Sequence, residues 1–153
     1  MKYWLFKSEP TAYSYDDLIR DGIAEWDGVR NFQARNFLRD AIKVDDRVLF
    51  YHSNTNPPAV IGTAVVTGEG YPDHTAWNPH SGHPDPKSTM ENPLWYMVDI
   101  KADKSFDNPV TLQEIRDNPV LQDMVLLRKG MRLSIQPVTK DQFETICGMG
   151  KRP

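Results

Sequence analysis

The chain has 153 residues and a net charge of −3 at pH 7, a length at which one domain with a substantial hydrophobic core is expected. This charge argues against a protein that coats nucleic acid by bulk electrostatics, because such binding needs many phosphate contacts. The single cysteine, Cys147, excludes an internal disulfide and a cysteine-based zinc cluster, and the lack of a signal-like or membrane-spanning apolar run predicts a cytoplasmic protein with no membrane partner.

The first fifty residues contain two apolar runs with a helical segment between them. Tyr3–Phe6 and Val48–Tyr51 have the length and composition of buried strands. Ser14 is placed to cap a short helix whose Leu18 and Ile19 are predicted to face inward. Two strands and one short helix are therefore expected here.

Residues 26–39 organise this half of the chain, because an Asp-Gly turn there runs into an amphipathic helix. The apolar residues on one helix face, predicted to point inward, are Ala34, Phe37, Leu38, Ala41 and Ile42. The opposite face offers amide and guanidinium groups from Gln33, Arg35, Asn36 and Arg39. Since backbone N–H groups at a helix start are unsatisfied, Arg30 and Asn31 at the turn are predicted to lie where an anion is favoured.

The middle of the chain alternates strands with a long loop. Ala59–Thr67 is predicted to be a third strand, and Gly62 inside it indicates a bulge or a close backbone approach. A polar, proline-rich segment follows over residues 71–93, and a loop of this length is more often functional than idle. Leu94–Lys101 is predicted to be a fourth strand.

Helix start signals recur near the C-terminus. Thr111 and Thr139 each begin a capping box, which predicts two further helices. Met131–Gln136 alternates like a strand and is expected to end at Pro137. The terminal helix is predicted to bury Phe143, Ile146 and Cys147.

These elements predict an α+β, β-rich fold. No glycine-rich phosphate loop follows any strand, so a parallel nucleotide-binding sheet is rejected in favour of a curved mixed sheet or pseudo-barrel of about 5–6 strands flanked by short helices. One domain is expected over residues 1–150, with a short tail at 151–153.

Five ordered strings of sequence resemble the EVE domain family. They are Lys7-Ser8-Glu9-Pro10, Trp26-Asp27-Gly28-Val29-Arg30-Asn31 with Gln33 to Leu38, Phe50-Tyr51-His52-Ser53, Tyr71-Pro72-Asp73, and Arg132 to Pro137. The resemblance implies a PUA-like fold and a role in reading nucleic acid, including a modified base. The related YTH domains read methylated adenine in RNA with a cage of aromatic side chains. Lys7-Ser8 is similar to the Lys-Ser pair at the end of their first strand, and Trp26 follows at about the position of a tryptophan of that cage. The candidates for a second aromatic residue of such a cage are Trp77 and Trp95. Trp95 lies inside a predicted strand and is expected in the hydrophobic core.

The function predicted from these observations is non-catalytic binding of DNA or RNA, with an extruded or single-stranded base held in an aromatic and polar pocket. The residues predicted to bind the base are Ser8, Glu9, Trp26, Asp27, Asn31, Gln33, Tyr51, His52 and Ser53. The residues predicted to contact phosphate are Arg30, Arg35, Arg39 and Arg132. No metal or other cofactor is expected, and the oligomeric state is left open.

The sequence offers four alternatives to this function. A metal site would use Asp73, His74, His80, His83 and Asp85, but their spacing fits no zinc pattern. An enzyme would use His52 as base with Ser8 or Ser53 as nucleophile, but no nucleophile elbow accompanies either serine. A small-molecule enzyme or metabolite-binding protein using the same cavity remains the main alternative, and an adaptor with an acidic surface is the fourth.

Overall fold

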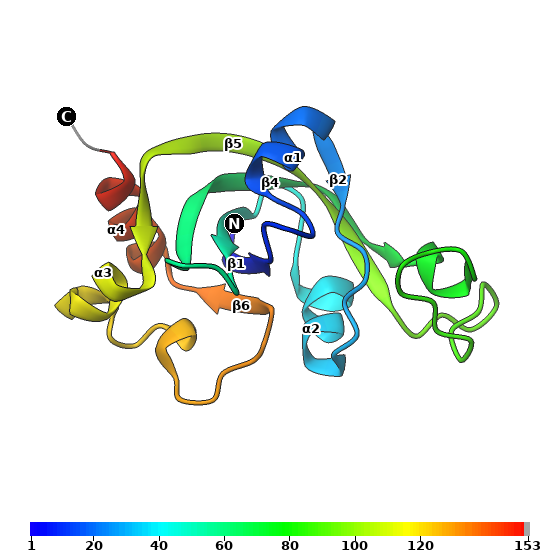
Figure 1. Cartoon of the computed structure of the whole chain (residues 1–153). Coiled ribbons are helices and arrows are strands. Elements are labelled where there is room, and N and C mark those ends of the chain that lie inside the picture. The colour runs from blue at the N-terminus through cyan, green and yellow to red at the C-terminus, as the bar shows by residue number, and fades with distance from the viewer. Residues whose placement is uncertain (152–153) are drawn as a thin grey trace.

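The computed structural model describes residues 1–151 and shows a six-stranded mixed sheet in the order β2-β5-β4-β3-β1-β6 (Figure 1). Only β1 and β3 pair in parallel among the described pairs; the other neighbours are antiparallel. β2 and β6 stand at the edges, so the sheet is open rather than closed. The strands are β1 (Tyr3–Ser8), β2 (Ile23–Glu25), β3 (Arg47–His52), β4 (Ala59–Pro72), β5 (Tyr96–Thr111) and β6 (Ile135–Val138). The predicted β-rich α+β fold is confirmed.

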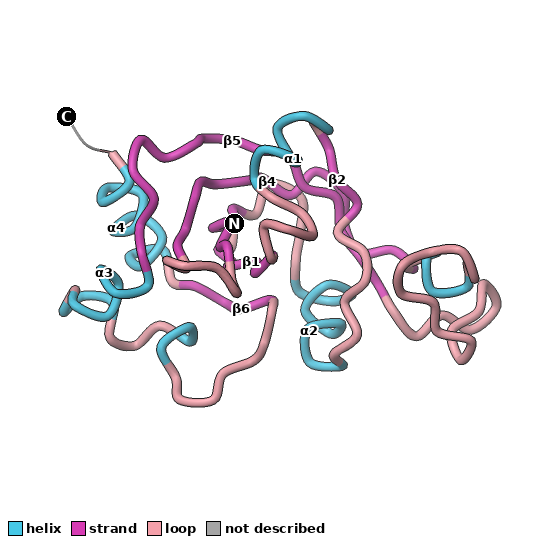
Figure 2. The backbone as a smooth tube through the Cα atoms, viewed as in Figure 1, coloured by secondary structure: helices cyan, strands magenta, loops and turns pink. Residues whose placement is uncertain are grey.

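Short helices and turns connect the strands (Figure 2). The α-helices are α1 (Tyr15–Asp21), α2 (Phe32–Asn36), α3 (Leu112–Asp117) and α4 (Lys140–Gly150). A π-helical turn η1 (Phe37–Ala41) continues α2, and 3-10 turns are formed by η2 (His74–Trp77), η3 (Pro119–Leu121) and η4 (Val125–Leu127). Within residues 1–151, no helix combines the length and apolar character needed to cross a membrane.

The sheet buries both faces because apolar residues run continuously along its central strands. On β1, Trp4 and Phe6 belong to one core cluster and Leu5 to the other. Successive strand residues point to opposite faces, so an unbroken apolar run supplies both cores. Leu18 of α1 packs into the first cluster and Ile146 of α4 into the second, so helices cover both faces of the sheet.

The long strands β4 and β5 bend at bulges. The register between them shifts on both sides of Gly62, which confirms the predicted irregularity. A Cβ atom at Gly62 would lie 2.6 Å from the Lys104 carbonyl oxygen and 2.7 Å from Cζ of Tyr15. This position therefore requires glycine, because backbone and a buried ring approach it closely.

The helix-capping predictions are confirmed. The side chains of Ser14, Thr111 and Thr139 each accept a hydrogen bond from the backbone N–H three residues on, and each helix has a reciprocal capping box. These caps satisfy N–H groups that a helix start leaves unpaired.

Several predictions about single elements were wrong. Ile19 is 51% exposed, because the seven-residue α1 presents only one face to the core. The last strand begins at Ile135 and includes Pro137, which an edge strand tolerates because the missing N–H would face solvent. β4 runs on to Pro72, five residues beyond the predicted end, because its distal half pairs with β5. Of the predicted tail at 151–153, residues 152–153 lie outside the described residues.

Candidate functional site

Trp26 borders a cleft while most of its indole is buried. The residue is 9% exposed, and its ring lies 5.5 Å from the ring centroids of both Phe6 and Phe50 and 6.0 Å from that of Tyr13. Its backbone N–H donates to the Val98 carbonyl oxygen, which fixes the chain at the end of β2. The cleft has a volume of about 800 Å³. Its lining includes Lys7, Ser8, Glu9, Tyr13, Asp21, Glu25, Trp26, Asp27, Gly28, Arg30, His83 and Ser134.

The turn after Trp26 is held by Asp73 at the end of β4. The Asp73 carboxylate, which is fully buried, accepts the Gly28 backbone N–H at 2.8 Å and the Arg30 Nη1 at 2.9 Å. Arg30 also donates from Nη2 to the His83 carbonyl oxygen at 2.8 Å. Burial alone would raise the pKa of Asp73, but hydrogen bonds from Thr75, Gly28 and Arg30 keep it below its ordinary value.

Two charged groups in the cleft are partly desolvated. Burial lowers the pKa of Lys7, whose ammonium has no hydrogen bond or ion pair to the part of the chain that the structure describes. Burial is also the main cause that raises the pKa of Asp27, although His83 opposes it from 3.6 Å. A polar ligand that formed hydrogen bonds with these groups would stabilise their charged forms.

The structure brings some predicted base-binding residues into this cleft. Ser8, Glu9, Trp26 and Asp27 line it, and so does Arg30 from the predicted phosphate group. His52 and Ser53 do not line it, although Ser8 and His52 are neighbours in the parallel pairing of β1 with β3. A base-binding role for the lining residues remains a prediction.

The other predicted base-binding residues have different surroundings. The Asn31 side chain caps α2 by accepting the Ala34 backbone N–H, and Gln33 is exposed on that helix. Tyr51 is 3% exposed and packs in the core cluster on the opposite face of the sheet. None of these three lines the cleft.

The remaining arginines predicted to contact phosphate lie outside the cleft. Arg35 donates from Nη1 to the Leu94 carbonyl oxygen, and Arg39 pairs with Asp40. Arg132 is exposed and makes no hydrogen bond or ion pair within residues 1–151.

Sequence reasoning did not assign Lys7, Tyr13 or His83 to the site. The sequence does contain a signal for Lys7, because this residue directly precedes Ser8 in the first string that resembles the EVE family. Tyr13 and His83 reach the cleft only through the fold, since one follows β1 and the other comes from the long loop after β4. Neither candidate for the second cage aromatic, Trp77 or Trp95, lines the cleft.

The side chains weighed for catalysis and metal binding have other partners. Ser8 Oγ donates to the Tyr13 carbonyl oxygen, and His52 Nε2 accepts the Tyr15 backbone N–H, so no Ser8–His52 hydrogen bond forms. Asp85 accepts a hydrogen bond from the Trp95 indole. Among the described residues, no three His, Cys, Asp or Glu side chains are grouped as a metal ion would need.

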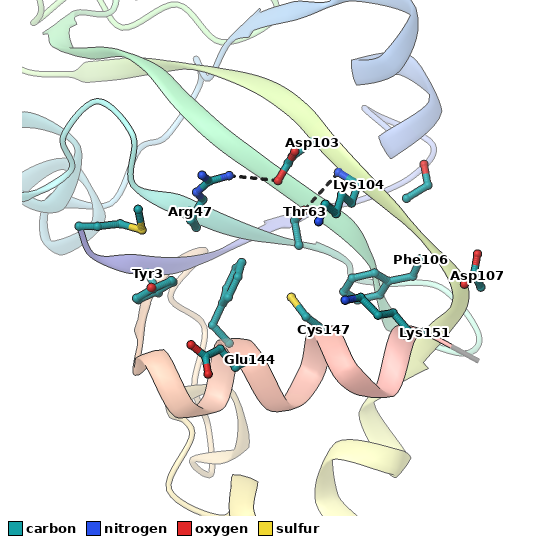
Figure 3. Close-up of a pocket in the computed structure, with 14 residues that line it drawn as sticks. Tyr3, Arg47, Thr63, Asp103, Lys104, Phe106, Asp107, Glu144, Cys147 and Lys151 are labelled. Carbon is teal, nitrogen blue, oxygen red and sulfur yellow. Dashed lines mark hydrogen bonds and ion pairs between the residues drawn. The ribbon is translucent and has the colours of Figure 1, made fainter. Parts of the chain in front are cut away.

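A second cleft of about 800 Å³ lies between α4 and the sheet (Figure 3). Tyr3, Phe106 and Cys147 give it an apolar floor, and the Arg47–Asp103 ion pair stands at its rim. It contains none of the predicted site residues. Its charged groups carry both signs, so they favour no particular class of ligand.

Comparison with known proteins places this geometry in a family. The family model described as "EVE domain" matches residues 2–149. The chain belongs to the EVE domain family. Thymocyte nuclear protein 1 of Mus musculus is 37% identical, over 96% of this chain and 73% of the mouse protein.

Solved structures share the fold over nearly the whole chain. A hypothetical protein from Leishmania major has a TM-score of 0.93 and 45% identity, covering 98% of this chain and 94% of that one. Human THYN1, solved in complex with DNA containing 5-methylcytosine, has a TM-score of 0.91 and 35% identity, covering 100% and 99% of the two chains. A Zymomonas mobilis ASCH protein, at 9% identity and a TM-score of 0.53, shares the fold alone.

Proposed function

We propose that this EVE domain is a non-catalytic nucleic-acid-binding protein that takes an extruded or single-stranded base, modified as in 5-methylcytosine, into the Trp26 cleft. The observation that carries this proposal is the likeness to human THYN1 over the full length of both chains, since that protein was solved with DNA containing 5-methylcytosine. A cytoplasmic location stays a prediction, and the Mus musculus relative is named as a nuclear protein.

The chemistry of the cleft supports a base as its ligand. Trp26 and Tyr13 offer aromatic surface at the wall, which suits a flat heterocycle. The Asp27 carboxylate can accept a hydrogen bond from an exocyclic amine such as that of cytosine, and the Lys7 ammonium can donate to a carbonyl oxygen. Each of these hydrogen bonds would offset the cost of partly burying the charge of Asp27 or Lys7.

The test compares charge-neutralising variants in the two clefts. Lys7→Gln and Asp27→Asn alter the Trp26 cleft, and Lys104→Gln and Asp107→Asn are matched controls in the second cleft. Fluorescence anisotropy would measure binding to short DNA and RNA strands that contain cytosine or 5-methylcytosine. Loss of a hydrogen bond to a charged group is worth about 10- to 100-fold in affinity, so the first pair should weaken binding by that factor while the controls bind like wild type.

Equal affinity of all four variants would remove the Trp26 cleft from the binding mechanism. The main alternative, a metabolite as ligand, is examined by mass spectrometry of small molecules released from the purified, denatured protein. A nucleoside or nucleotide in that material would support the proposal, whereas a chemically unrelated metabolite would support the alternative.

A further inference from the structure

Aromatic rings and guanidinium groups form a column that leads away from the Trp26 cleft. It consists of Arg30, Trp95, Phe32 and Arg35, and we call it the Trp95–Phe32 column. Arg30 Cζ lies 5.5 Å from the Trp95 ring centroid. The rings of Trp95 and Phe32 are stacked, with centroids 4.8 Å apart and an interplanar angle of 27°, and Arg35 Cζ lies 4.9 Å from the Phe32 centroid. Because Arg30 also lines the cleft, the column begins where the cleft ends.

Trp95 inside the column and Arg35 at its outer end are both fixed by hydrogen bonds. The Trp95 indole is 6% exposed and donates from Nε1 to Asp85 at 2.6 Å. Arg35 is held over Phe32 by hydrogen bonds from Nη1 to the Leu94 carbonyl oxygen at 2.8 Å and from Nε to Asn36 Oδ1 at 2.9 Å. Little conformational entropy is lost when a ligand meets groups that are already ordered.

The outer end of the column is open. Phe32 is 56% exposed, although it is stacked on a buried tryptophan. Because Trp95 and Arg35 lie over the faces of the Phe32 ring, the part of Phe32 left in water is its edge, and the Arg35 guanidinium ends the column.

Arg35 gives this open end a positive charge. Both of its side-chain hydrogen bonds go to neutral oxygens, whereas Arg39, one helical turn away, forms two hydrogen bonds to the carboxylate of Asp40. The Nη2 group of Arg35 makes no hydrogen bond within the described part of the chain. A guanidinium that has no ion-pair partner and rests on an aromatic ring fits a nucleotide, because a base can stack on the guanidinium and a phosphate can accept its hydrogen bond.

We propose that the outer end of the Trp95–Phe32 column binds the nucleotide next to the one held in the Trp26 cleft. The base of this neighbouring nucleotide stacks on the Arg35 guanidinium and packs against the exposed edge of Phe32, and the free Nη2 of Arg35 donates to its phosphate. This inference rests on the proposed function, since it needs a base in the cleft. It adds a second contact that a free nucleoside cannot make.

The test combines a Phe32 variant with DNA that lacks one base. Phe32→Ala, Phe32→Leu and Phe32→Trp are compared with wild type on a short single-stranded DNA with one 5-methylcytosine and on the same strand with an abasic site on either side of it. Val120→Ala is the matched control, because Val120 is 60% exposed and lies on η3, outside the column. Thermal unfolding would check that each variant folds.

Phe32 supports the guanidinium on which the base stacks, so we expect Phe32→Ala and Phe32→Leu to weaken binding of the intact strand by roughly 5- to 150-fold, the effect of one lost base stack. Phe32→Trp and the control should bind like wild type. On the strand that is abasic at the neighbouring position, wild type and Phe32→Ala should bind equally. Arg35→Gln should reduce the slope of log affinity against log salt by about one.

The outcomes separate this inference from the proposed function. If Lys7→Gln and Asp27→Asn weaken binding but Phe32→Ala does not, the neighbouring-nucleotide site is refuted and the cleft stands. A Phe32→Ala defect of the same size on intact and abasic strands would also refute it, since the ring would then act without a base beside it. If no strand binds wild type, both proposals fail.

Discussion

Replacing Asp73 by Asn tests how the turn that carries Asp27 is held. The buried carboxylate accepts hydrogen bonds from Gly28, Arg30 and Thr75, and its partner Arg30 is only 23% exposed at the side chain. Asparagine has nearly the same shape but no charge, and its amide group cannot accept the bonds that one carboxylate oxygen accepts. The variant therefore leaves a largely buried guanidinium without its counter-ion.

The expected cost follows from these contacts. Removing one partner of a buried ion pair lowers the free energy of unfolding by about 3–5 kcal/mol. Because Arg30 is partly exposed, we expect a loss at the lower end of this range, near 3 kcal/mol. With an m-value of roughly 2 kcal/mol/M, the urea midpoint should fall by about 1.5 M. Asp40→Asn is the control, because its ion pair with Arg39 is exposed and should be worth less than about 1 kcal/mol.

The pH dependence gives an independent check. Because the pKa of Asp73 lies below its ordinary value in the folded protein, the stability it contributes is present above the unfolded pKa and is lost as the pH falls through the folded pKa. Urea unfolding at several pH values should therefore show the difference between wild type and Asp73→Asn shrinking in acid. A loss at pH 7 below about 0.5 kcal/mol would refute the claim that Asp73 anchors the turn.

Three further variants test single features of the structure by thermal and urea unfolding. Gly28→Ala should destabilise the fold by about 1–2 kcal/mol, because Gly28 has a φ of +78° and a Cβ atom there would lie 3.0 Å from the His83 ring. The control is Gly148→Ala, which should not destabilise the fold because the space around Gly148 is open. Burial raises the pKa of Asp27, so its charge costs stability as the pH rises through that pKa. Asp27→Asn should therefore be more stable than wild type at pH 7, and the gain should vanish below about pH 4. Thr139→Ala should cost about 1 kcal/mol through loss of the α4 cap, and an unchanged midpoint would contradict the capping argument.

Local signals in the sequence predicted the elements that depend on local physics. The capping boxes at Thr111 and Thr139 and the bulge at Gly62 were found because each involves a few neighbouring residues with one strongly preferred conformation. The apolar runs of β1 and β3 were found because a strand buried on both faces has no polar residue to interrupt it.

The lining of the candidate cleft was predicted less completely than the fold, because its walls come from distant segments. Trp26 was identified, but its contacts with Phe6 and Phe50 and its small exposed fraction depend on how β1 and β3 pair. Tyr51 has the polar tip expected of a ligand residue, yet the alternation along β3 sends it to the opposite core. Periodicity identifies which residues share a face; which face borders the cleft depends on sheet order.

The long loop after β4 links the two proposed contacts through Arg30. This residue binds Asp73 at the start of the loop and the His83 carbonyl within it, and its guanidinium lies over Trp95 at the end. The loop folds around a charge that belongs to the turn after Trp26, so the cleft and the Trp95–Phe32 column share one anchor. A ligand that spans both would therefore meet two surfaces whose relative position is already set, which lowers the entropy lost on binding. Asp73→Asn should for this reason weaken the cleft and column contacts together, whereas Phe32→Ala removes only the second.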